Sequence, residues 1–107
     1  MRRLSALLAA AAWALLSQPS PAAAAPRTHT VVIDKMKFGT MPNGVRAGDV
    51  IIWQNRDMFR HSATANGKFD VDLPAGKTVR MRVSASGAFP LLCKYHPGMK
   101  AVLKVTK

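Results

Sequence analysis

Residues 77–83 read KTVRMRV, and this stretch decides the fold. Val79, Met81 and Val83 alternate with polar or charged residues. A period of two places the apolar side chains on one face of a β-strand and the polar ones on the other. The stretch therefore predicts a strand with one face on a core and the other in water.

Further short apolar runs surround this strand. Residues 50–53 read VIIW, so both faces of that strand are apolar and a central position in a sheet is expected. In residues 31–38 the phase of the alternation slips, which predicts a bulge near Lys35 with Met36 facing inward. Gly, Pro and Asn separate the remaining runs, at residues 61–65, 69–73, 89–93 and 100–106. Short strands broken by turn residues predict an all-β sandwich or barrel.

The first 24 residues have the order of a secretory signal peptide. Two arginines precede an apolar run of 13 residues, Leu4 to Leu16, and a run of alanines follows. A membrane-spanning helix needs about 18 apolar residues, so we expect cleavage and no stable membrane insertion, with an uncleaved anchor as the alternative. We expect residues 1–24 to be removed and residues 25–107 to form one domain in the periplasm.

The charge and the cysteine content limit the functions that the protein can have. The chain has 16 basic and 5 acidic residues, a formal charge of +11 that becomes +9 without the two signal arginines. This excess favours an acidic partner surface, and export argues against nucleic acid. Cys93 is the single cysteine and cannot form an internal disulfide. A free thiol in an oxidising compartment is protected from oxidation only if it is buried or bound to a metal.

The stretch CKYHPGM begins at Cys93 and sets Cys93, His96 and Met99 at Cys-x2-His-x2-Met spacing between two expected strands. A loop of this length can turn a thiolate, an imidazole and a thioether toward one point. With a second imidazole they make the ligand set of a blue-copper electron-transfer site. His61 begins a run in mid-chain, whereas His29 lies near the expected new N-terminus. We expect one copper ion, held by His61, Cys93, His96 and Met99.

On these residues the chain resembles the cupredoxins, and its ligand loop is similar to the short loop of amicyanin-like members. The resemblance covers residues 31–105 and includes Gly48-Asp49-x-Ile51-x-Trp53-x-Asn55, His61, the Phe69-Asp70 pair, Pro74-Ala75-Gly76-Lys77 and the ligand loop. It implies an all-β Greek-key β-sandwich of about seven or eight strands, with the metal at one end under the loops.

The resemblance also implies partners. A monomer that shuttles single electrons between transient redox proteins is expected, with an amine dehydrogenase as donor and a c-type cytochrome as acceptor. His96 is the expected exit for electrons, through a small apolar patch. Arg56, Arg60, Lys94 and Lys100 are near the ligands in sequence and predict a positive rim that attracts acidic partners and weakens with salt.

Three positions depart from the family pattern. One is Leu92, where plastocyanin-like relatives have an aromatic residue that offers electrons a second route, so that route is not expected here. Relatives often have Asn after the first histidine and Ser or Thr after the cysteine, which hydrogen-bond across the site. Here these positions are Ser62 and Lys94. Such bonds position the ligands, so we expect a weaker bridge and a looser site.

Two other functions compete with electron transfer. Copper enzymes built on this fold need additional His-rich copper centres, and the single spare histidine, His29, cannot supply them, so no enzyme is expected. Storage or delivery of copper by the same four ligands is the alternative. Rapid loss of copper to a chelator would favour delivery, whereas retention and fast electron exchange would favour a carrier.

Overall fold

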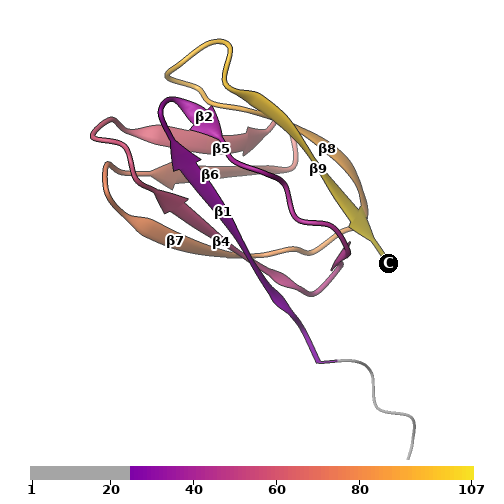
Figure 1. The fold of residues 1–107 in the computed structure, drawn as a ribbon. Coiled ribbons are helices and arrows are strands. Elements are labelled where there is room, and N and C mark those ends of the chain that lie inside the picture. The colour runs from indigo at the N-terminus through magenta and orange to yellow at the C-terminus, as the bar shows by residue number, and fades with distance from the viewer. Residues whose placement is uncertain (1–24) are drawn as a thin grey trace, which may run out of the picture.

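The computed structural model describes residues 25–107 as two β-sheets packed face to face (Figure 1). The nine strands are β1 (Thr28–Asp34), β2 (Lys37–Phe38), β3 (Val45–Arg46), β4 (Val50–Asn55), β5 (His61–Ala65), β6 (Phe69–Leu73), β7 (Thr78–Arg82), β8 (Gly87–Leu92) and β9 (Lys100–Thr106). These residues form no helix, and hence none long and apolar enough to cross a membrane. The expected signal peptide lies outside the described residues.

The strands are shared between a four-stranded and a five-stranded sheet. The first has the order β2-β1-β4-β7 and the second the order β3-β9-β8-β5-β6. β1 pairs with β4 and β3 pairs with β9 in parallel, and the other ladders are antiparallel. The all-β sandwich is therefore confirmed. Its strand count exceeds the expected seven or eight because β2 and β3, each of two residues, are too short to leave a periodic signal.

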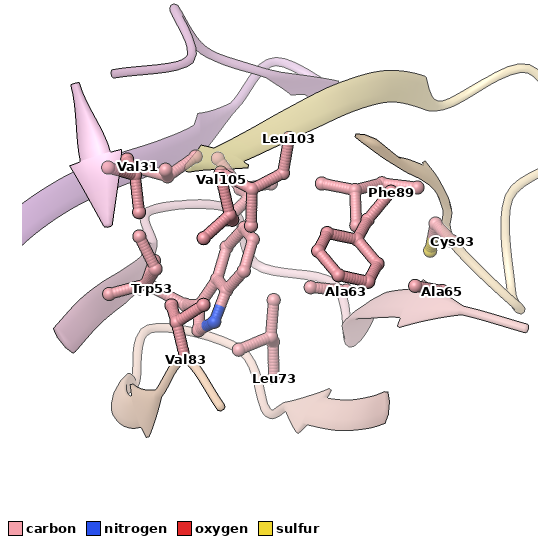
Figure 2. Close-up of a cluster of buried hydrophobic side chains, with 14 of the residues drawn as sticks. Val31, Trp53, Ala63, Ala65, Leu73, Val83, Phe89, Cys93, Leu103 and Val105 are labelled. Carbon is pink, nitrogen blue, oxygen red and sulfur yellow. The ribbon is translucent and has the colours of Figure 1, made fainter. Parts of the chain in front are cut away.

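The core lies between the sheets (Figure 2). Trp53, Ile51 and Leu103 are fully buried, and each such side chain stabilises the fold by about 1.5–3 kcal/mol. Cys93 lies at one end of this cluster, beyond Phe89, and is 4% exposed. The thiol therefore faces the packed interior and not solvent.

The structure confirms the predictions made for residues 77–83, which include β7, and for residues 50–53, which lie in β4. In β7 the exposed residues Thr78, Arg80 and Arg82 alternate with half-buried Val79 and Met81. β4 is flanked by β1 on one side and β7 on the other, which makes it a central strand.

The expectation of a bulge near Lys35 is wrong. β1 ends before it, and Lys35 and Met36 form a two-residue turn with φ of 52° and 63° that reverses the chain into β2. Positive φ at both central residues is typical of the hairpin turn that matches the strand twist. Met36 therefore stands on the turn and is 37% exposed instead of facing inward.

Candidate metal centre

The loop between β4 and β5 delivers His61, and the buried amide of Asn55 shapes that loop. Asn55 Nδ2 donates to the carbonyl oxygens of Phe59 and Leu73, both at 2.9 Å, and Asn55 Oδ1 accepts from the backbone N–H of Asp57 at 2.9 Å. These bonds tie the loop and the end of β6 to the last residue of β4. His61 is thereby the first residue of β5 and is fully buried.

The loop between β8 and β9 carries the other sequence-predicted ligands. The backbone N–H of Cys93 donates to Met99 O, and the N–H of Met99 donates to His96 O, both at 3.2 Å. Gly98 has a φ of 101°, in the region that favours glycine, and this lets the chain turn back into β9. The loop is therefore closed on itself by its own backbone.

Three of the four predicted ligands meet at one end of the sandwich. The Nδ1 atoms of His61 and His96 lie 3.1 Å apart, and each lies 3.7 Å from Cys93 Sγ. Met99 is 5% exposed, in the same loop and in the same buried cluster as Cys93. His29 is elsewhere, paired with Asp49, as its position near the N-terminus had indicated.

The spacing of these donors fits a metal ion. A point in the plane of the three atoms lies about 2.0 Å from each of them, and about 2.0–2.3 Å is the usual bond length from a metal such as zinc to imidazole nitrogen or thiolate sulfur. Two imidazoles and a thiolate are donors that suit copper, and Met99 of the same loop offers a thioether as the fourth. The residues therefore fit the copper ion that the sequence predicts.

Asp57 orients His61, and the sequence analysis missed it. Asp57 Oδ2 lies 2.7 Å from His61 Nε2, and its carboxylate also accepts from the backbone N–H groups of Lys35 and Met36 at 2.7 and 2.9 Å. Burial raises the pKa of Asp57, but these three donors outweigh it and the pKa is lowered. An ionised carboxylate only accepts, so His61 Nε2 holds the proton and Nδ1 keeps its lone pair for a metal.

The local sequence around Asp57 gives only a weak signal of its role. It is an acidic residue in a polar loop, and such residues are usually solvated. Its position four residues before His61 was the available signal, but a loop has no fixed periodicity that would aim one side chain at the other. The tie to Lys35 and Met36 depends on a turn that the sequence analysis had read as a bulge.

A bridge across the site is present although both Ser62 and Lys94 depart from the family pattern. Ser62 is fully buried and its Oγ accepts from the backbone N–H of Lys94 at 2.9 Å. The residue after His61 is therefore bonded to the residue after Cys93 although neither has the usual side chain. The donor of this bond is the backbone N–H of Lys94 and not its side chain.

The surface around His96 is apolar at its centre. His96 is half-buried, and the Phe59 ring packs edge-on against it with centroids 6.2 Å apart. Phe59 is 58% exposed, and Met58 in the same loop and Tyr95 in the loop between β8 and β9 are 89% and 46% exposed. Large apolar side chains exposed together are typical of an interaction site.

The positive rim is partly neutralised. Lys94 Nζ lies 2.7 Å from Asp70 Oδ2, and Arg60 Nε lies 3.2 Å from Asp72 Oδ1. The ammonium of Lys94 and then the hydroxyl of Thr64 lower the pKa of Asp70. Arg56 and Lys100 form no ion pair within residues 25–107.

A two-sheet sandwich with two imidazoles and a thiolate converging at one end defines the class of the cupredoxins. Amicyanin-alpha of Methylorubrum extorquens is 31% identical over 109 residues, which cover 94% of this chain and 88% of the relative. The chain belongs to the amicyanin family of cupredoxins. No family model matches it.

Solved structures agree on the fold. The crystal structure of amicyanin from Paracoccus versutus superposes with a TM-score of 0.62 at 22% identity, over 73% of this chain and 80% of that one. A mutant amicyanin in its reduced Cu(I) form at pH 4 gives 0.61 at 25% identity, over 73% and 81%. Amicyanins are electron carriers and not enzymes, so the protein is a type 1 copper protein of electron transfer with one copper ion.

Proposed function

We propose that His61, Cys93, His96 and Met99 hold the copper ion and that the protein carries single electrons between partner proteins in the periplasm. The observation that carries this proposal is that donor atoms of the first three lie within 4.8 Å of one another, although His61 and Cys93 are 32 residues apart in sequence. When bound, copper supplies a one-electron exchange between Cu(II) and Cu(I).

Each residue contributes in a different way. The Cys93 thiol gives up its proton when it binds a metal, which also protects it from oxidation. His61 is oriented by Asp57, and its burial excludes water. Since His61, Cys93 and Met99 are 0%, 4% and 5% exposed, the site is held by the packed interior on that side. A rigid site suits electron transfer because the ligands then move little when copper changes its oxidation state.

His96 is the point where a partner comes nearest. It is the one proposed ligand that is half-buried and not buried, and Phe59 and Met58 extend an apolar surface beside it. A small apolar patch supports brief, weak docking of the kind that transient redox partners use. Membership of the amicyanin family supports an amine dehydrogenase as the donor and a c-type cytochrome as the acceptor.

Addition of Cu(II) to the purified apoprotein tests the ligand set. We expect an intense blue colour from charge transfer between thiolate and copper, and its loss in Cys93→Ser. Met99→Leu should change the spectrum and the reduction potential, whereas Met81→Leu, a control on the far sheet, should change neither. A colourless wild-type complex, or a Cys93→Ser variant that stays blue, would reject the ligand set.

Copper retention separates the carrier from a storage or delivery protein with the same ligands. The burial of three of the four ligands supports slow release. We expect the loaded protein to keep its copper against a chelator for far longer than it needs to exchange an electron with a c-type cytochrome. Release that is faster than electron exchange would instead favour delivery.

Export is tested by expressing the full chain in a bacterium and fractionating the cells. The order of residues 1–24 supports removal of that segment during secretion. The periplasmic protein should then begin at Ala25 by mass spectrometry. A full-length protein retained in the membrane would support the uncleaved anchor.

A further inference from the structure

A chain of hydrogen bonds begins at the backbone of Lys94, the residue after Cys93. The N–H of Lys94 donates to Ser62 Oγ at 2.9 Å, and Ser62 Oγ lies 2.8 Å from Thr64 Oγ1. Thr64 Oγ1 donates to Asp70 Oδ1 at 2.8 Å. Lys94 Nζ then donates to the other oxygen, Asp70 Oδ2, at 2.7 Å. The bonds therefore form a closed ring, which starts and ends on Lys94.

Along both arms of this ring the hydrogen bonds run from donors on Lys94 to the carboxylate of Asp70. Asp70 has a lowered pKa and is ionised, so its two oxygens only accept. Thr64 must then donate to Asp70, which leaves its oxygen to accept the hydroxyl of Ser62. Ser62 in turn accepts from the Lys94 N–H. Each hydroxyl donates once and accepts once, so no polar atom of the ring's interior is left unsatisfied.

The ring joins segments that the backbone joins weakly. β5, which begins with His61, and β8, which ends before Cys93, share a single register pair, Thr64 with Leu92. Thr64 also faces Asp70 across the ladder between β5 and β6. The same threonine is thus the meeting point of three strands, and its hydroxyl is central to the ring.

Burial distinguishes the two halves of the ring. Ser62 and Thr64 are 0% and 6% exposed, whereas the side chains of Asp70 and Lys94 are 50% and 43% exposed. Hydrogen bonds shielded from water hold geometry better than an exposed ion pair, which salt screens. The two hydroxyls therefore position the Lys94 backbone, and the ion pair orients Asp70 from outside.

We propose that the ring of Ser62, Thr64, Asp70 and Lys94 holds Cys93 against His61, with Thr64 on β5 and Asp70 on the edge strand β6 as positioning residues. The proposal rests on the ligand set proposed above. If so, side chains of β5 and β6 do more than pack in the sheet. They set the distance between the start of β5, which carries His61, and the loop that carries Cys93.

Thr64→Val tests the ring because it keeps the shape and removes the central hydroxyl. In the apoprotein, amide hydrogen exchange of Lys94 should accelerate by about tenfold or more, while the N–H of Cys93, bonded to Met99 O, should keep its rate. In the loaded protein, copper affinity should fall by about 10-fold. Thr64→Ser restores the hydroxyl and should restore both values.

Two exposed aspartates of β6 supply a matched pair in case the valine variant does not fold. Asp70 and Asp72 each have a side chain that is 50% exposed and ion-paired, but only Asp70 belongs to the ring. Asp70→Asn should accelerate exchange at Lys94 and shift the reduction potential, and Asp72→Asn should do neither.

Unchanged exchange at Lys94 in both Thr64→Val and Asp70→Asn would overturn the proposal, as would a Thr64→Ser variant no better than Thr64→Val. The exchange measurement needs no copper. A wild-type protein that binds no copper but shows the expected exchange pattern would therefore reject the ligand set and leave the ring in place as a link between segments.

Discussion

The carboxylate of Asp57 lies 2.7 Å from Nε2 of His61, on the side of the ring opposite the donor atom that faces Cys93. The same carboxylate accepts two backbone N–H groups from the turn at Lys35 and Met36. One side chain therefore ties a surface turn, the loop after β4 and a buried imidazole together. The proton on Nε2 and the orientation of the ring both depend on it.

Asp57→Asn should weaken copper binding by about 10- to 100-fold, because an amide cannot hold the imidazole proton as a carboxylate does. Competition with a chelator of known affinity measures the change. Asp34→Asn is the control, since Asp34 is exposed next to the same turn and its carboxylate accepts from the Lys35 N–H without contacting His61 within residues 25–107. Equal copper affinity in the Asp57 variant and the wild type would show that Asp57 is not needed to orient His61.

Asp49 should make the fold sensitive to acid. Backbone N–H groups of Arg27 and Arg46 and the His29 side chain donate to this carboxylate, which is 3% exposed. Together these hydrogen bonds lower the pKa of Asp49 from 3.8 to about 2. The bond from Arg27 contributes most, followed by those from His29 and Arg46. The stability that the ionised form contributes is therefore complete above about pH 4 and is lost as the pH falls toward 2.

Urea unfolding of the apoprotein between pH 5 and pH 2 measures this dependence. In Asp49→Asn the midpoint should start lower at pH 5 and fall less steeply below pH 4 than in the wild type. Asp57 and Asp70, whose pKa values are also lowered, leave a residual slope in both proteins. Parallel curves for variant and wild type would contradict the assignment.

The unpaired basic residues beside the site should steer an acidic partner. We expect the double variant of Arg56→Gln and Lys100→Gln to react on the order of 10-fold more slowly at low salt with a c-type cytochrome of net negative charge. Its rate should also depend less on ionic strength. Arg82→Gln, on the outer face of β7, is the control. An equal loss of rate in this variant would show that the net charge of the protein, and not the position of Arg56 and Lys100, controls the reaction.

Leu103→Ala should destabilise the sandwich by about 2–5 kcal/mol, because Leu103 is fully buried between the sheets and the change leaves a cavity. Val102→Ala, one position along β9 and 45% exposed, should cost far less. Chemical denaturation of the two variants compares them directly. A similar loss of unfolding free energy in both variants would mean that Leu103 does not face the core and Val102 does not face solvent.

Several elements could be predicted because their signal is local. The alternation in residues 77–83 and the apolar run at 50–53 identify β7 and the central strand β4, since a strand's faces follow from a period of two. The turn at Lys35 and Met36 was misread as a bulge because neither residue is a glycine, the usual marker of positive φ.

The sequence by itself determined the spacing of Cys93, His96 and Met99, because a short loop between two strands must bring its own side chains together. Only the tertiary structure decided that His61 meets them, that Asp57 orients His61, and that Thr64 and Asp70 close a ring with Lys94. The reason is that these contacts join residues on different strands and loops. Their distances are set by strand register and by the packing of the two sheets, which no short stretch of sequence contains.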